Sequence, residues 1–395
     1  MTERPILWLH SHFLLPTGGT KFIYEVTRRV AARRPIEVLV DQASPYWRDR
    51  YREAGVPLRE LGSRTSTSML YWLAFPAVLR RNLGPVERAA AGAGVIVSSF
   101  FPMQWLGGRA AAKLGLRHVH LCFEPFPFFY DAGVVSMYPL PKRAMLRWLA
   151  LAYSGIDRKG VASADSLLTL NDVTAGAIEQ VYGISGAVPT LAGVDTDVFR
   201  PYDEVELADL RTRHGQGPIA VHSTDFSPIK RTDLALRAFA VSRSPGRLLI
   251  TSTIDDARGL ASMQALAAEL GIADRVEFLG FVPYEDLPRY YSLADVLIQT
   301  GTSAMSGATS MALPVKEAMA CGTAVVRSGA TDEDVEDGVS GYLVDPADVE
   351  QTGARIRTLL EAPERARSMG EAARTKIVGL YSWERVVDVV LAAAA

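Results

Sequence analysis

Cysteine is scarce in this chain, which has only two in 395 residues, Cys122 and Cys321. Both lie in apolar surroundings in the sequence, so we expect two buried thiols rather than a disulfide or a metal-binding pair. No apolar run reaches the ~18 residues that a membrane-spanning helix needs. Charge of one sign is also lacking, since 42 basic side chains stand against 44 acidic ones. The sequence therefore predicts no general field for nucleic acid.

Two further absences concern location and cofactor. The first residues, from Met1 to Pro5, lead at once into a predicted strand and do not form a signal peptide, so a cytoplasmic location is expected. The pattern GxGxxG follows none of the predicted strands, which argues against a dinucleotide oxidoreductase. The hydrophobic fraction of 48% and the charged fraction of 22% are ordinary for a globular enzyme.

Apolar or β-branched runs alternate with helical patterns along the chain. The runs predict strands at residues 6–10, 36–41, 95–99, 118–123, 166–170, 219–223, 248–252, 276–279, 296–299, 324–327 and 342–344. The patterns predict helices at 21–32, 69–83, 105–114, 142–161, 172–182, 233–241, 260–270, 287–294, 349–360, 364–375 and 383–394. This alternation is typical of an α/β fold with doubly wound parallel sheets.

The two sets of elements predict two Rossmann-like domains, at residues 1–186 and 187–380, a division that the chain length also favours. Ligands of such sheets bind beyond the carboxyl ends of the strands. We therefore expect the site in a cleft between the two domains.

The segment from Leu313 to Val326 is the most informative part of the sequence. Pro314 suits the first turn of a helix, Glu317 is expected in that same turn, and Gly322 is expected to end the helix. The free N–H groups of a helix N-terminus attract anions. A carboxylate in the first turn could accept hydrogen bonds from the vicinal hydroxyls of a ribose.

This segment resembles the donor-site signature of the family 4-type retaining glycosyltransferases, the glycosyl transferases group 1 with the GT-B fold. Residues 16–21, 190–201, 227–239, 276–296 and 333–346 resemble further motifs of that family in the same order. The resemblance implies two Rossmann-like domains facing across a cleft, the first binding the acceptor and the second the donor. It also implies that a C-terminal helix, at 381–395, packs back on the first domain.

The resemblance implies a nucleotide-sugar donor carrying UDP, GDP, ADP or TDP, an alcohol acceptor, and no required cofactor. It implies no metal either, and we interpret Asp195 and Asp197 as residues that order the connection between domains, because a metal site needs more oxygen ligands.

Several residues receive donor-binding roles from the resemblance. Lys230 would neutralise the diphosphate as charge grows on it, and Glu317 would hold the ribose. Phe281 and Val282 would border the base, although a plain strand and turn explains them equally well. The remaining candidates offer backbone to phosphate, namely Gly18, Gly19, Met311, Ala312 and Leu313. A tight turn is the alternative explanation for the two glycines.

Two positions depart from the family pattern. Thr309 stands where the family has a glutamate that contacts the transferred sugar, so sugar recognition is expected to differ. Asp225 stands where the family has an arginine, and a carboxylate repels a diphosphate. Either Arg231 or Lys21 supplies the missing charge, or Asp225 points away, or donor binding is weakened.

The acceptor side is expected in the first domain, around an aromatic, proline-rich stretch from Arg117 to Asp131. His118 and His120 share one face of a strand by its period of two. His120 and Glu124, with Lys230 and Thr309, are the candidate catalytic residues, although a histidine in a strand is commonly a satisfied interior group.

Basic and aromatic side chains occur together near Tyr71 and Arg80, and again near Lys142 and Trp148. Amphipathic helices that pack on a sheet would explain these stretches without a membrane. A lipid-linked acceptor would instead favour peripheral contact with the inner face of a membrane.

Taken together, the motifs predict a retaining glycosyltransferase of carbohydrate biosynthesis, whose acceptor is a glycan, a lipid-linked intermediate or a natural product. A catalytically weakened sugar-nucleotide-binding protein is one alternative. A GT-B enzyme that acts on the sugar nucleotide alone is the other.

Overall fold

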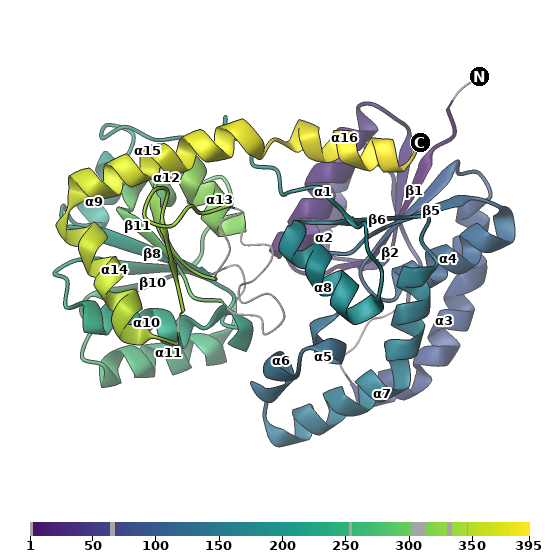
Figure 1. Ribbon diagram of the computed structural model, residues 1–395, viewed down its shortest axis with the longest axis horizontal. Helices are drawn as coiled ribbons and strands as arrows, with labels where there is room; N and C mark the ends of the chain where they lie inside the picture. The colour runs from purple at the N-terminus through teal and green to yellow at the C-terminus, as the bar shows by residue number, and fades with distance from the viewer. Residues whose placement is uncertain (1–2, 64–67, 253–254, 302–312, 330–333, 346) are drawn as a thin grey trace. The chain divides into compact units, whose positions relative to one another are not determined.

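The computed structural model describes residues 3–63, 68–252, 255–301, 313–329, 334–345 and 347–395. The chain forms two compact units (Figure 1). Unit 1 combines Met1–Gly193 with Trp383–Ala395, and unit 2 is Val194–Ser382. Each unit is built around one parallel sheet, as the alternating sequence pattern predicts.

The sheet of unit 1 has the strand order β3-β2-β1-β4-β5-β6-β7. Its strands are β1 (Ile6–Phe13), β2 (Ile36–Ala43), β3 (Leu58–Glu60), β4 (Val95–Ser99), β5 (Arg117–Leu121), β6 (Ser166–Thr169) and β7 (Val188–Pro189). Its helices are α1 (Gly18–Ala31), α2 (Pro45–Glu53), α3 (Met69–Ala90), α4 (Met103–Leu114), α5 (Pro127–Tyr130), α6 (Ala132–Ser136), α7 (Leu140–Ala162), α8 (Asp172–Tyr182) and α16 (Trp383–Ala393).

The sheet of unit 2 has the order β10-β9-β8-β11-β12-β13. Its strands are β8 (Ile219–Thr224), β9 (Arg247–Ser252), β10 (Val276–Phe281), β11 (Val296–Gln299), β12 (Ala324–Ser328) and β13 (Tyr342–Val344). Its helices are α9 (Ala208–His214), the 3₁₀ turn η1 (Pro228–Lys230), α10 (Thr232–Ser242), α11 (Ala257–Glu269), α12 (Leu287–Leu293), α13 (Leu313–Ala320), α14 (Val349–Glu361) and α15 (Pro363–Leu380).

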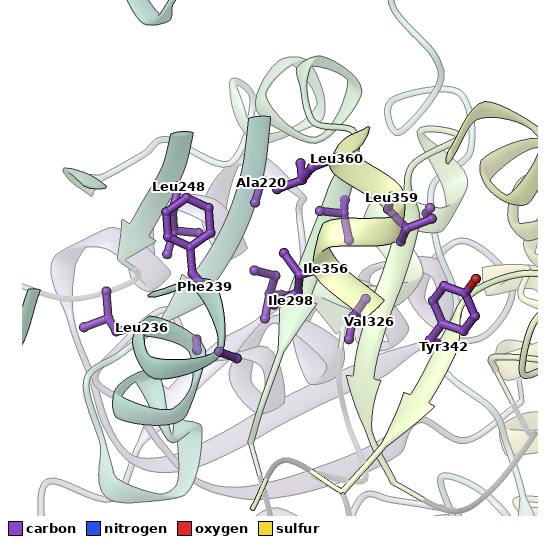
Figure 2. Packing of buried hydrophobic residues seen from close by; sticks show 14 of the residues in the cluster. Ala220, Leu236, Phe239, Leu248, Ile298, Val326, Tyr342, Ile356, Leu359 and Leu360 are labelled. Atoms are coloured by element: carbon purple, nitrogen blue, oxygen red, sulfur yellow. The ribbon is translucent and has the colours of Figure 1, made fainter. Parts of the chain in front are cut away.

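The core of unit 2 lies between its sheet and helices α10 and α14 (Figure 2). Phe239 of α10 and Ile356 of α14 are fully buried against Ile298 and Val326 of the central strands. Removal of this apolar surface from water is the main force that holds the layers together. Strands covered in this way need apolar residues on both faces, which is why the sequence shows them as continuous runs.

The last helix, α16, packs against α1 within unit 1. Trp383 contacts Phe22 with 5.4 Å between ring centroids, and the Arg29 guanidinium lies over the indole ring. The Arg34 guanidinium donates to the carbonyl of Ala394. The C-terminal segment thus belongs to the unit that the N-terminal residues form.

Several short elements escape sequence-based prediction. Helices α2, α5, α6 and α9 and strands β3 and β7 were not expected. Strand β3 has only three residues, two of them charged and exposed at the sheet edge, so it lacks the apolar pattern by which strands are recognised.

Helix α3 corrects a predicted boundary, because it continues beyond residue 83 through Pro85 to Ala90. Val86 and Ala90 are fully buried there, and their burial outweighs the backbone hydrogen bond that proline cannot donate. Both cysteines are buried free thiols, as predicted. Among the described helices, none is long and apolar enough to span a membrane.

Candidate functional site

The sheet of unit 2 reverses its winding direction between β8 and β11, which are neighbours although β9 and β10 lie between them in the sequence. Ligands of doubly wound sheets bind outside the carboxyl ends of the strands at such a point. The loop after β8 carries Lys230, and β11 is followed by Thr300. The Thr300 hydroxyl donates to the carbonyl of Arg231 at 2.8 Å, which joins the two strand ends.

Lys230 and Arg231 have different surroundings in this loop. Arg231 donates to both carboxylate oxygens of Asp233, at 3.0 and 2.9 Å, and it adopts a left-handed backbone conformation with φ 49°. No ion pair of Lys230 occurs among the described residues. Lys230 is therefore the cation of this pair that a bound anion could reach without breaking an existing ion pair.

Asp225 follows β8 directly, and its carboxylate accepts a hydrogen bond from the Ser227 N–H at 2.9 Å. This contact orders the turn that leads to Lys230 and gives Asp225 a local structural role. The charge of Asp225 raises the pKa of His222, whereas the charge of Lys230 lowers it. Both charges therefore act on the same strand end.

His222 supports the loop from inside the sheet. Its ring lies 2.9 Å from the Ile298 carbonyl and 3.1 Å from the Thr232 hydroxyl, which ties β8 to β11 and to the start of α10. Burial lowers the pKa of His222 to about 4, so the ring is neutral near pH 7. A neutral ring adds no positive charge to the strand end, so the cations there are Lys230 and Arg231, of which Arg231 is paired with Asp233.

Helix α13 corrects the expected position of Glu317. The helix begins at Leu313, so Glu317 is its fifth residue and lies in the second turn rather than the first. A turn has 3.6 residues, and the helix starts one residue before Pro314. Glu317 is only 4% exposed. Burial raises the pKa of the neighbouring Tyr291, and the charge of Glu317 raises it further.

A cluster of buried charges beside Glu317 was not anticipated from the sequence. Lys316 of α13 and Arg327 of β12 both form ion pairs with Asp334, and all three side chains are buried. This arrangement ties the first turns of α13 to the strand end of β12. Charged residues within otherwise apolar helix and strand patterns were the available signal.

The end of β10 presents the two residues expected near the base. Phe281 is 56% exposed, whereas Val282 is buried. The strand register shifts between Phe278 and Gly280, where Gly280 has φ 70°. An exposed aromatic ring next to a glycine turn could stack on a flat ligand.

Unit 1 has its own reversal, between β1 and β4. Gly18 and Gly19 begin α1, which follows β1 after a short loop, and Thr17 caps that helix. A Cβ on Gly19 would lie 3.1 Å from the ring of Phe100, which follows β4 with φ 64°. Close packing against Phe100 thus explains Gly19 without a ligand.

His120 and His118 lie on the same face of β5, and both rings contact the Ser98 hydroxyl, at 3.0 and 2.8 Å. His120 is 2% exposed, and burial lowers its pKa to about 3. Its surroundings are those of a satisfied interior group. Glu124 lies three residues beyond β5. Burial is the main cause that raises the pKa of the Cys122 thiol, and the charges of Asp157 and Glu124 raise it further.

Asp157 anchors the aromatic segment after β5, a role that the sequence did not indicate. Its carboxylate accepts hydrogen bonds from Tyr130 and Tyr182, each at 2.8 Å, and from Gln104 at 2.6 Å. Tyr130 belongs to α5, so this network fixes the proline-rich stretch against α7 and α8.

Three predicted site residues, Thr309, Met311 and Ala312, lie outside the described residues. Leu313 is buried at the start of α13. Within the described part of the chain, no group of three or more His, Cys, Asp or Glu side chains is arranged to hold a metal ion.

Two family models together match most of the chain. Residues 17–190 match the glycosyl transferase 4-like domain, and residues 210–376 match glycosyl transferases group 1. The first match lies in unit 1 and the second in unit 2.

Curated relatives carry glycosyltransferase names. A GDP-mannose-dependent alpha-(1-6)-phosphatidylinositol monomannoside mannosyltransferase of Mycolicibacterium smegmatis is 32% identical over 60% of this chain and 63% of the relative. A D-inositol 3-phosphate glycosyltransferase of Segniliparus rotundus is 34% identical over 59% of this chain and 52% of its own length. The matched part thus spans less than two thirds of these relatives.

Solved structures share the fold at low sequence identity. The Anabaena protein HepE in complex with UDP has a TM-score of 0.74 at 17% identity, covering 99% of both chains. Sucrose-phosphate synthase from Thermosynechococcus elongatus has a TM-score of 0.74 at 19% identity, covering 99% of this chain and 98% of its own.

Proposed function

Because this chain belongs to the family 4-type glycosyltransferases with the GT-B fold, we propose that it is a retaining glycosyltransferase. It would move a sugar from a nucleotide-sugar donor to an alcohol acceptor. The observation that carries this proposal is the placement of Lys230 and Thr300 at the reversal between β8 and β11, with α13 and Glu317 following β11.

Each donor group has a candidate partner in unit 2. Lys230 would meet the diphosphate, since its ammonium has no ion pair among the described residues. Glu317 would hold the ribose from its buried position on α13, and Phe281 would lie against the base. Backbone N–H groups at residues 311–313 would bind phosphate oxygens at the start of the helix.

The reaction would proceed by attack on one face of the sugar. The acceptor hydroxyl oxygen forms a bond to the anomeric carbon on the side of the departing diphosphate, and the bond from that carbon to the phosphate oxygen breaks. An oxygen of the leaving diphosphate takes the hydroxyl proton. Lys230 would stabilise the charge that grows on the diphosphate, a contribution that is largest in the transition state. His120 would act only as a neutral group, because its pKa lies far below 7.

Thermal unfolding with UDP, GDP, ADP or TDP tests the donor site. Ligand at about a hundred times its dissociation constant should add about 2.7 kcal/mol of stability. We expect one nucleotide to stabilise the protein, and Glu317→Ala to abolish this effect. GDP is the first candidate, because one relative is named as GDP-mannose-dependent. Glu371→Ala, at an exposed position on α15, is the matched control.

Product analysis tests the transfer itself. The matching sugar nucleotide is incubated with D-inositol 3-phosphate or phosphatidylinositol monomannoside, acceptors that the names of the relatives suggest. Retention of the anomeric configuration in the product, measured by NMR, would support the proposed mechanism. Inversion would contradict it.

One alternative function is favoured by Asp225, whose negative charge lies at the same strand end as Lys230. In that case the protein would bind a sugar nucleotide without transferring the sugar. Nucleotide stabilisation combined with no product from any donor and acceptor would identify this alternative. Release of free sugar from donor alone would instead indicate an enzyme that acts on the sugar nucleotide by itself.

A further inference from the structure

Two helices of unit 1 carry large apolar side chains that are exposed. We define the α3–α7 face as the exposed side of these helices, whose apolar members are Met69, Leu70, Leu73, Leu140 and Leu151. Leu151 is 87% exposed and Leu70 is 79% exposed. Single exposed leucines are common, but five large apolar side chains on two helices of one layer form a pattern that needs an explanation.

These side chains are not part of the core of unit 1. The opposite sides of the same helices supply the core, with Phe75 and Leu79 on α3 and Leu146 and Tyr153 on α7. The two helices meet where Tyr153 donates its hydroxyl to a backbone carbonyl of α3 and its ring packs on Phe75 at 5.0 Å. The exposed apolar residues therefore face outward from a layer that is already packed.

The exposed charges of α3 and α7 are mainly positive. Arg80 of α3 and Lys142 and Arg147 of α7 are exposed. The acidic residues of these two helices are Glu87, which pairs with Lys113 of α4, and Asp157, which is 2% exposed. Asp131, which precedes α7, is 1% exposed and caps α6. The whole chain has a net charge of −2, so this local excess of positive charge is not a general property of the protein.

We propose that the α3–α7 face docks unit 1 onto an anionic membrane surface. Leucines inserted at the boundary of the acyl chains and cations at the headgroups are the two features that an interfacial helix requires. A second copy of the chain is a poorer occupant, because self-association through this face would bring like charges together. The docking is peripheral, since none of the described helices can span a membrane.

Sedimentation with vesicles tests this inference on the full chain. We expect binding to phosphatidylcholine vesicles that contain phosphatidylglycerol, and little binding to phosphatidylcholine alone. Each cation near an anionic surface contributes about 1 kcal/mol, so Arg147→Glu should weaken binding about fivefold or more. Leu151→Ser should weaken it as well, and added salt should weaken it further.

Matched variants in unit 2 control for charge and hydrophobicity. Arg213→Glu changes the net charge equally, and Val205→Ser removes an apolar side chain that is 85% exposed. Both should bind vesicles like the wild type. No binding to anionic vesicles, equal loss in control and face variants, or a dimer in solution that Leu151→Ser dissociates would each overturn the proposal. Nucleotide-induced stabilisation, measured without vesicles, reports on the donor site separately.

Discussion

Asp334 Oδ2 lies 2.8 Å from the Nζ of Lys316, and both side chains are at least 94% buried. A second cation, Arg327, pairs with the same carboxylate. Burial alone would raise the pKa of Asp334, but the Lys316 and Arg327 charges outweigh it and hold the pKa well below its usual range. This carboxylate therefore compensates two buried cations beside the proposed donor site.

Replacing Asp334 by Asn should destabilise unit 2 strongly. The variant leaves two buried cations without their counter-ion, and breaking a buried pair in this way costs about 3–5 kcal/mol. Asp209→Asn breaks an exposed ion pair with Arg289, which solvent screens, so it should cost far less stability than Asp334→Asn. Denaturant unfolding measures the stability of both variants. An equal loss of stability in the two would contradict the structural role of the cluster.

The same group predicts a pH dependence. The folded pKa of Asp334 is lowered, so its contribution to stability is present above the ordinary carboxyl pKa of about 3.9 and is lost as the pH falls below it. The free energy of unfolding of the wild type should therefore fall more steeply with decreasing pH in that range. The Asp334→Asn variant should lack that part of the profile.

Asp41 should show the opposite dependence. Burial raises its pKa to about 6, although Ser63 and Arg81 oppose the shift. The folded protein then binds a proton more tightly than the unfolded chain, so the contribution of Asp41 to stability falls as the pH rises from about 4 through 6.

The variant Asp41→Asn tests this sign. It cannot ionise and keeps an oxygen for Ser63 and Asn82, the two hydrogen-bond donors to Asp41. Above pH 6 it should be more stable than wild type by up to about 3 kcal/mol. Asp49→Asn, at an exposed position, should leave the profile unchanged. A variant that is less stable at every pH would show that the charge is needed.

Gly193→Ala should weaken the attachment of α16 to unit 1. A Cβ at Gly193 would lie 2.8 Å from the Trp383 Cα, so backbone must move to accommodate it. Such overpacking costs about 1–3 kcal/mol. Gly176 is the control, because it lies within α8 with no atom within 4 Å, and Ala there should stabilise by about 0.5–1 kcal/mol. Thermal unfolding measures both, and no loss with Gly193→Ala would contradict the packing.

Lys230 and Arg231 should differ in nucleotide binding although they are neighbours. Lys230→Ala removes a charge-assisted contact to the diphosphate, worth about 1.5–3 kcal/mol, so affinity should fall about 10- to 100-fold. Arg231 is already bound to Asp233, and Arg231→Ala should reduce affinity less than Lys230→Ala does. Calorimetry with nucleoside diphosphates measures both, and a larger effect at Arg231 would reverse the assignment.

Local patterns made much of the fold predictable. The residues that form β4, β11 and α8 could be read from apolar runs and helical periodicity, because burial in a parallel sheet or on one helix face dictates which residues are apolar. The same logic identified Cys122 and Cys321 as buried thiols. The position of Glu317 was less predictable, since one residue at a helix start changes the turn to which it belongs.

The sequence by itself determined the alternation of strands and helices, the family, and the order of the motifs, because these depend on neighbouring residues. Only the tertiary structure decided which distant charges meet. Lys316 and Asp334 are 18 residues apart, and Tyr130 and Asp157 are 27 apart. No local sequence pattern predicts such partners, since they are brought together by the packing of separate elements around the two sheets.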